Sequence, residues 1–138
     1  MKSYKLLNHT ADIGIKVWGK TKKEALANTV EAMFDLLTDS NNISVVQTKQ
    51  RTISGADIAD TLINLLREAL YMFHAQAWLC KKCEILELSA KKLVARFSGE
   101  PYDAKKHQLK MEIKAVTYHT LKIERVDKGW RARVIFDV

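Results

Sequence analysis

Proline, glycine and cysteine are scarce in this sequence. Its 138 residues include one proline, five glycines and two cysteines, and they contain no internal repeat or low-complexity tract. These absences exclude repeat architectures and disordered low-complexity chains. No apolar run approaches the length that spans a bilayer, and the first four residues lead into a strand-like segment rather than a secretory signal. We therefore expect a cytosolic protein with reduced thiols and no membrane partner.

The sequence signatures of common catalytic sites are also absent. The chain has no glycine-rich phosphate loop, no Gly-x-Ser-x-Gly elbow, no His-Glu-x-x-His motif and no dinucleotide fingerprint. No nucleophilic triad can be assembled from the four histidines, which are His9, His74, His107 and His119. The sequence therefore does not identify an enzyme of a common class.

The two cysteines form a single Cys-Lys-Lys-Cys pair, Cys80 and Cys83. A structural zinc site needs four ligands and usually a second pair, which this chain lacks. A redox centre would place the motif at the start of a helix, whereas here it follows a long predicted helix and precedes the strand-like residues 84–89. We interpret the pair as two incidental thiols.

Length and composition are those of one globular domain, residues 1–138. Hydrophobic residues make up 47% of the chain and charged residues 28%, and a domain of this size buries roughly two-thirds of its unfolded surface. The net charge of +7, from 23 basic and 16 acidic residues, favours contact with nucleic acid, nucleotides or an acidic protein surface. Solvated faces would equally explain the denser basic patches at residues 20–23, 105–110 and 125–133.

The period of the apolar residues changes along the chain and predicts the architecture. Alternation predicts strands at residues 2–7, 13–18, 43–53, 84–88, 93–97, 111–123 and 130–137. Capping boxes that begin at Thr21 and Ser54 predict two amphipathic helices, the second extending to about His74 or Trp78. Gly129 suits a tight turn that needs a positive φ. We predict an α+β two-layer sandwich, with two helices packed on one face of a mostly antiparallel sheet.

Two acids, Asp12 and Asp137, lie far apart in the chain but in similar settings. Each falls on the less apolar side of an alternating segment. If the first and last strands pair, the two carboxylates meet at one rim of the sheet and offer hard oxygen ligands for calcium or magnesium. Because calcium takes six to eight oxygens, the Val138 carboxylate, water or a partner would complete the shell. The alternative is that Asp12 belongs to a turn and Asp137 is a frayed terminal acid.

Residues 98–107 contain the only proline and show no apolar period. A connection of this length is long for a compact domain and is often functional, although a surface hairpin loop would also explain it. With the two aspartates, this region and its neighbours supply the candidate polar set: His9, Asp12, Glu100, Lys106, His107, Glu112 and Asp137.

Four separated motifs, in the same order and over the whole chain, resemble the archease family. They are residues 9–15 (HTADIGI), 99–107 (GEPYDAKKH), 113–119 (IKAVTYH) and 129–138 (GWRARVIFDV). The resemblance implies a non-catalytic accessory protein that activates the RtcB-type RNA ligase of tRNA splicing. That ligase joins tRNA halves with manganese and GTP through a guanylylated histidine. Its accessory protein is expected to promote guanylylation and multiple turnover and to broaden nucleotide use.

The resemblance also implies site residues and a fold. The family's metal ligands fall on Asp12 and Asp137, with the Val138 carboxylate close by; we expect calcium, with magnesium and manganese as alternatives. Residues needed for ligase activation fall on Lys106 and Glu112, and the further members of this set are His9, Glu100 and His107. The fold implied is a strand-helix-strand-strand module within a two-layer sandwich, in agreement with the predicted architecture.

Our leading hypothesis is that the Asp12–Asp137 rim brings a divalent ion to the ligase's nucleotide pocket. Lys106 would add positive charge for phosphate, and Glu112 would orient metal, water or Lys106. A rival hypothesis is a direct RNA-binding chaperone of tRNA halves, which the lack of exposed aromatics disfavours because Trp130 and Phe136 lie on the apolar parity. A stand-alone metal-dependent hydrolase would need a nucleophile or base that the sequence does not identify.

Overall fold

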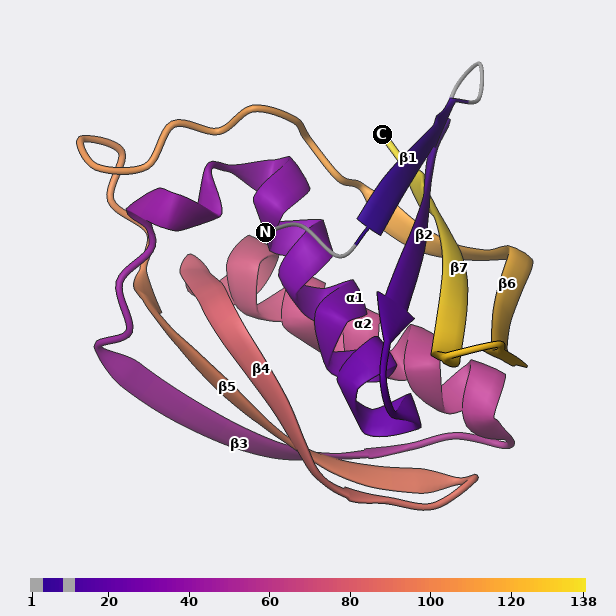
Figure 1. Ribbon diagram of the computed structural model, residues 1–138. Helices are drawn as coiled ribbons and strands as arrows, with labels where there is room; N and C mark the ends of the chain where they lie inside the picture. The colour runs from indigo at the N-terminus through magenta and orange to yellow at the C-terminus, as the bar shows by residue number, and fades with distance from the viewer. Residues whose placement is uncertain (1–3, 9–11) are drawn as a thin grey trace.

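The computed structural model describes residues 4–8 and 12–138 (Figure 1). In chain order the elements are β1 (Tyr4–Asn8), β2 (Asp12–Gly19), α1 (Lys22–Leu37), the short 3₁₀ helix η1 (Ser40–Asn42), β3 (Gln47–Ser54), α2 (Ile58–Gln76), β4 (Trp78–Leu88), β5 (Lys92–Pro101), β6 (Ala115–Val126) and β7 (Gly129–Asp137). Neither α1 nor α2 is long and apolar enough to cross a membrane.

The strands form two antiparallel sheets, whereas we expected one. The larger sheet has the order β1-β2-β7-β6 and the smaller has the order β3-β5-β4. The helices lie between the sheets and contact both (Figure 1): α1 packs on β2, β7 and β4, and α2 packs on β6, β3 and β4. The α+β class, with two helices packed on antiparallel strands, is confirmed. The consecutive elements β3, α2, β4 and β5 form the expected strand-helix-strand-strand module.

Each helix begins at a side chain that caps its first turn. Thr21 starts α1 as predicted, because its hydroxyl accepts a hydrogen bond from the Glu24 N–H at 3.1 Å. The prediction for α2 was wrong by three residues, since Asp57 rather than Ser54 is the cap and accepts from the Asp60 N–H at 2.8 Å. Asp60 in turn accepts from the main chain before the cap. This reciprocal pair has the spacing of a capping box. The type of motif was therefore predicted correctly, but it lies three residues later in the chain than predicted.

Four strand boundaries also differ from the predictions, and the largest difference is that β4 begins at Trp78 rather than at residue 84. β3 begins at Gln47; of the β-branched residues before it, Ile43 is buried in the core, whereas Val45 and Val46 are 55% and 68% exposed. β5 continues to Pro101, so residues 98–101 belong to a strand rather than to the predicted loop; proline is tolerated there because it ends the strand. β6 begins at Ala115 rather than at residue 111, and its register breaks between Thr117 and Lys122.

Both cysteines lie inside β4 rather than before a strand. Their thiols are free and buried. Burial raises the pKa of Cys80 to about 12 and raises the pKa of Cys83 well above its ordinary value. A buried, protonated thiol is a poor nucleophile and a poor metal ligand, which agrees with the interpretation of the pair as incidental.

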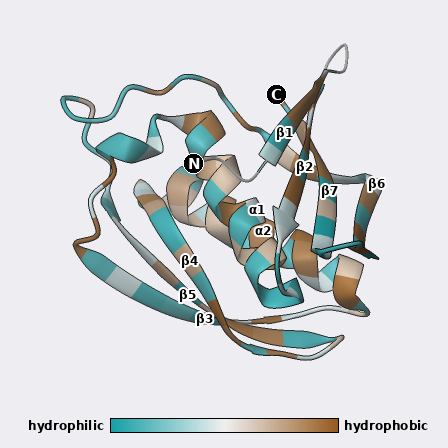
Figure 2. Cartoon of the chain, viewed as in Figure 1, coloured by the Kyte–Doolittle hydropathy of each residue, from teal (hydrophilic) through white to brown (hydrophobic). Residues whose placement is uncertain are grey.

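The core lies between the helices and the inner faces of the two sheets. Figure 2 shows apolar and polar residues alternating along the strands, so each sheet has one apolar face. The largest fully buried side chains include Phe34 of α1, Trp78 of β4, Phe97 of β5 and Phe136 of β7. Burying a large apolar side chain contributes about 1.5–3 kcal/mol. The apolar alternate residues of β2 and β7 pack toward the helices, so the polar alternate residues of these strands face away from them.

Candidate functional site

The strand pairing on which the predicted aspartate site depends is present. β2 and β7 are antiparallel neighbours, and Asp12 lies directly opposite Asp137. Directly opposite residues project from the same face of a sheet, with Cβ atoms about 5 Å apart. That face is the outer one, because the adjacent pair, Ile13 and Phe136, packs in or against the core. The two carboxylates are therefore neighbours at one rim of the larger sheet.

The Asp12–Asp137 pair has part of the donor set that a hard divalent cation needs. Neither carboxylate takes part in a hydrogen bond or ion pair with another described residue, so all their oxygens remain available. Across residues 4–8 and 12–138, no group of three or more His, Cys, Asp or Glu side chains could hold a metal. Since calcium takes six to eight oxygens, the pair would need the Val138 carboxylate, water or a second protein. The chemistry of the set fits such an ion, but its number of ligands is incomplete.

Asp137 is held in place from two sides. β2 flanks Asp137 on one side of β7, and on the other side Ala115 of β6 pairs with it. The Lys114 N–H also donates to the Asp137 main-chain oxygen at 2.7 Å. The segment before β6 is fastened to α2, because His74 Nε2 donates to the Ile113 carbonyl at 2.9 Å. The rim is therefore supported by the helix layer as well as by the sheet.

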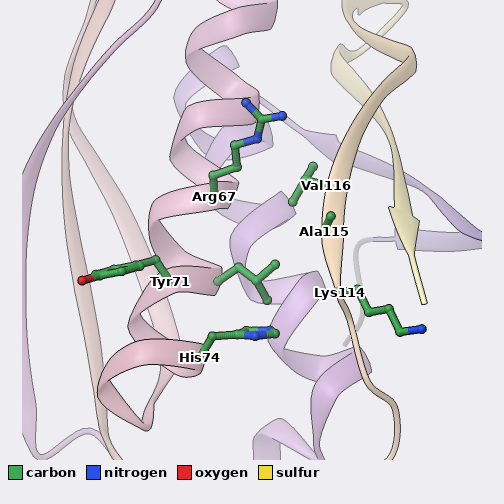
Figure 3. Close-up of a pocket in the computed structure, with 7 residues that line it drawn as sticks. Arg67, Tyr71, His74, Lys114, Ala115 and Val116 are labelled. Carbon is green, nitrogen blue, oxygen red and sulfur yellow. The ribbon is translucent and has the colours of Figure 1, made fainter.

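A pocket of about 310 Å³ lies beside this support, between α2 and the start of β6. In Figure 3 the His74 ring points toward β6, whereas the Tyr71 ring points away from it. The lining residues are Arg67, Leu70, Tyr71, His74, Lys114, Ala115 and Val116. None of these is a carboxylate, so the pocket does not extend the Asp12–Asp137 donor set.

A second cluster surrounds the Glu100 carboxylate at the end of β5. Glu100 Oε2 accepts from Lys106 Nζ at 2.7 Å, from His107 Nε2 at 2.8 Å and from the Ser44 N–H at 2.8 Å. Lys106 Nζ also donates to Glu100 Oε1 at 3.0 Å and to the Ser44 hydroxyl at 2.8 Å. Glu100 and His107 are 8% and 1% exposed, but the Lys106 side chain is 40% exposed. The cluster therefore has a buried carboxylate and imidazole and one partly exposed basic side chain.

Both nitrogens of the His107 ring are occupied. Nδ1 accepts from the Asp103 N–H at 2.9 Å, so it carries no proton and Nε2 must be the donor to Glu100. The Asp103 carbonyl closes the turn by accepting from the main-chain N–H groups of Lys106 and His107 at 3.0 and 2.8 Å. The Tyr102 ring stacks on the imidazole, with centroids 6.0 Å apart. His107 therefore acts as a positioning residue and has no free nitrogen for a metal.

The surroundings of Glu100 lower its pKa to about 2. Burial raises the pKa, but hydrogen bonds from Lys106, the Ser44 N–H and His107, together with the Lys106 charge, favour the carboxylate more strongly. The group is therefore ionised in the folded protein at any pH above that range.

We expect this cluster to make the protein sensitive to acid between about pH 4.5 and pH 2. Because the folded-state pKa is depressed from 4.5 to about 2, the contribution to stability is complete above pH 4.5. It is lost as the pH falls toward 2, since the unfolded chain takes up the proton first. Urea midpoints measured from pH 6 to pH 2 should fall less steeply for Glu100→Gln than for the wild type. Parallel curves would contradict the assignment.

The structure divides the predicted site residues into two groups. One is Asp12 with Asp137; the other is Glu100 with Lys106 and His107. In Figure 1 the connection that follows β5 (orange) turns at the upper left and crosses the top of the molecule before it reaches β6, beside the end of β7. The two groups are therefore separate sites that one segment of the chain links.

Glu112 does not join either group in the described part of the structure. Glu112 is exposed in the segment before β6, and the described carboxylate that contacts Lys106 belongs to Glu100. His9 lies outside the described residues. Sequence reasoning missed Ser44, which lay in a segment predicted to be a strand. It also missed the turn at Asp103, whose Asp-x-x-x-His spacing could have indicated it.

Comparison with known proteins agrees with the four motifs. Residues 4–138 match the Archease protein family (MTH1598/TM1083). The chain belongs to the archease family. It is similar to the archease of Pyrococcus abyssi, with 34% identity over 100% of both chains, and to that of Methanosarcina acetivorans, with 33% identity over 99% of this chain and 97% of the relative.

A solved archease-like structure supports the same assignment. The solution structure of Methanobacterium thermoautotrophicum protein 1598 matches with a TM-score of 0.75 and 27% identity, and the match covers 100% of both chains. The fold described above is therefore that of this archease-family neighbour. The residues matched by the family include both β2, which carries Asp12, and β7, which carries Asp137.

Proposed function

We propose that this archease is a non-catalytic accessory protein of an RtcB-type RNA ligase in tRNA splicing. It promotes guanylylation of the ligase, sustains multiple turnover and broadens the nucleotides that the ligase accepts. Its partners are the ligase, GTP or another nucleotide held by the ligase, and tRNA halves indirectly. Family membership supports this role, and the absence of common catalytic motifs in the chain agrees with it.

The observation that carries the proposal is the pairing of Asp12 with Asp137 on the outer face of the larger sheet. Two uncompensated carboxylates directly opposite each other repel, and this costs stability unless a cation lies between them. An isolated pair with too few oxygens for a closed shell suits a site that a second protein completes. We infer that Asp12 and Asp137, with the Val138 carboxylate, hold calcium, or magnesium or manganese in its place.

The bound ion would supply positive charge that neutralises phosphate oxygens during nucleotidyl transfer. The chain's own contribution is to fix the two carboxylates through β2, β7 and the start of β6. Lys106, oriented by Glu100 and Ser44, adds positive charge for phosphate from a separate site. Glu112 is exposed and accessible to the ligase, and His9 is a further residue of the proposed ligase-activating set.

Substituting either aspartate is expected to abolish stimulation of the ligase. Asp12→Asn and Asp137→Asn keep the size of the side chain but remove the negative charge that a divalent ion requires. The measurement is the rate of ligase guanylylation with and without each variant. Calcium affinity of the isolated variants, measured by calorimetry, supplies a readout that does not depend on the ligase.

Glu87→Gln is the matched control, because Glu87 is an exposed acid on β4 in the smaller sheet. It removes the same charge and should leave both readouts unchanged. Full stimulation by folded Asp12→Asn and Asp137→Asn would overturn the role of the pair. Lost stimulation with unchanged calcium affinity would assign the aspartates to contact with the ligase instead.

A further inference from the structure

Four basic side chains form one continuous row across the outer face of the larger sheet. Lys5 of β1 lies opposite Lys16 of β2, Lys16 lies opposite Arg133 of β7, and Arg133 lies opposite Lys122 of β6. Since directly opposite residues share a face, the four cations all project away from the helices. With strands about 4.8 Å apart, the row spans about 14 Å.

This row is poorly compensated by acids. None of Lys5, Lys16 and Arg133 forms an ion pair with a described residue, and the buried Arg133 Nε has no hydrogen-bond partner there. Lys122 contacts Glu124 at 3.4 Å, but Glu124 also contacts Arg131 at 3.2 Å. Like charges directly opposite each other destabilise a sheet. A line of four cations is therefore a feature that an external polyanion would stabilise.

The next row on the same face adds an aromatic ring. Trp18 of β2 lies opposite Arg131 of β7 and is 37% exposed. It lines an open hollow of about 590 Å³ at the β6–β7 turn, together with Arg125, Val126, Asp127, Lys128 and Arg131. Successive rows on one face are about 6.7 Å apart along a strand. The ring therefore lies beside the cation row, and further basic groups surround it.

We propose that this face binds the phosphodiester backbone of a single-stranded polynucleotide. Phosphates would lie along Lys5, Lys16, Arg133 and Lys122, and an unpaired base would stack on Trp18. A nucleic acid strand explains both features, because it carries evenly spaced charges and planar rings. An acidic polypeptide would satisfy the cations but offers nothing specific for the Trp18 ring. A duplex keeps its bases paired and out of reach of that ring.

The aspartate pair fixes the direction of the bound strand. Asp12 and Asp137 lie on the same face two rows beyond the Lys16–Arg133 pair, a separation of about 13 Å. Phosphates are repelled from that rim, so the backbone crosses the strands along the cation row instead of following them. The cation row is thus separate from the metal pair on the same face, and the proposed binding does not depend on the ligase-activating role.

Binding of fluorescent oligouridylate to the isolated protein, measured by anisotropy in EDTA without ligase, tests the proposal. Four phosphate contacts predict a slope of about −3 for log affinity against log salt, since each contact contributes about −0.7. Lys16→Gln with Lys122→Gln should reduce the slope by about 0.7 for each charge removed. Trp18→Ala should weaken binding about tenfold with little change in slope.

Lys91→Gln with Lys92→Gln is the matched control, because these exposed lysines lie at the β4–β5 turn of the smaller sheet. It makes the same change in net charge and should leave affinity and slope nearly unchanged. Equal weakening by the two double variants would overturn the proposal, since it would indicate only non-specific attraction to net charge. Polyglutamate binding that depends equally on Lys16, Lys122 and Trp18 would also overturn it, in favour of an acidic protein partner.

Oligodeoxythymidylate of the same length shows whether the face distinguishes an RNA strand from a DNA strand. Similar affinity for both probes would assign recognition to phosphates and base stacking alone, as proposed. A preference for oligouridylate would add a 2′-hydroxyl contact to the same face. Because EDTA removes divalent ions and no ligase is present, failure here would leave the proposed activation of the ligase untouched. Loss of ligase stimulation in Asp12→Asn would likewise leave this proposal intact.

Discussion

Replacing Gly99 with alanine is expected to destabilise the protein by about 3 kcal/mol or more. A Cβ atom at this position would collide with the Leu79 carbonyl oxygen and would lie 2.8 Å from the Leu79 carbonyl carbon and 2.9 Å from Cys80 Cα. All three are main-chain atoms of the paired strand β4, so they can move away only by breaking the β4–β5 pairing. The Gly99 carbonyl also accepts from the Val46 N–H at 2.9 Å, and that bond would shift too.

Thermal and urea unfolding of Gly99→Ala measure this effect. The melting temperature should fall by about 10 °C or more. Ser98→Ala is the control, because Ser98 is the adjacent β5 residue and its hydroxyl makes only a 3.4 Å contact with Thr48. That variant should cost less than about 1 kcal/mol. Near-equal stability of the two variants would mean that β4 and β5 are not as close as the structure describes.

Replacing Glu100 with alanine should cost about 2–3 kcal/mol of folding free energy. The substitution leaves the His107 Nε2–H and the Ser44 N–H without their acceptor, and an unsatisfied buried donor costs about 1–3 kcal/mol. Lys106 contributes little to this cost, since its half-exposed ammonium group can turn to water. Urea unfolding at pH 7 gives the value directly.

Two further variants separate acceptor geometry from charge. Glu100→Gln keeps an acceptor oxygen for His107 and should cost about 1 kcal/mol, less than Glu100→Ala. Lys106→Ala should cost still less, because the buried half of the cluster survives. If Lys106→Ala were as destabilising as Glu100→Ala, the exposed ion pair and not the buried hydrogen bonds would hold the loop to β5.

Local patterns were sufficient for the features that depend on parity. The alternation of Ile13, Ile15 and Val17 against Val134 and Phe136 determined which face Asp12 and Asp137 would share, and the structure confirms their pairing. Residue parity has only two outcomes, so a clear alternation settles it. Gly129, with φ of 147°, occupies the turn that its sequence predicted.

Features that depend on distant partners could not be predicted in the same way. An alternating strand has the same pattern in either sheet, so nothing local assigns β3, β4 and β5 to a sheet of their own. Both Ser54 and Asp57 satisfy the spacing of a capping box, and the tertiary contacts of α2 decide between them. The burial of His107 depends on Glu100 and Tyr102, which reach it only after β5 and the Asp103 turn have formed.

The exposure of Trp18 is another feature that the local sequence pattern did not predict. Counting Trp130 and Phe136 on the apolar parity was correct for Phe136, which is fully buried. Trp18, on the polar parity of β2, is 37% exposed, and Tyr71 and Tyr118 are exposed too, so the expected lack of exposed aromatics was wrong. Parity indicated the face of Trp18, but only the strand order shows that this ring adjoins a row of cations.

β7 comes after the other six described strands in the chain, yet it occupies an interior position in its sheet, between β2 and β6. On the ribosome, the hairpin of β1 and β2 therefore emerges long before its neighbour exists, with one hydrogen-bonding edge unmatched. Such unpaired edges are prone to association with other chains. Closure of the sheet must wait until β7 has left the exit tunnel. Both the aspartate pair and the cation row consequently come into being only after β7 has emerged, so a nascent chain that stops before β7 should lack either binding capacity.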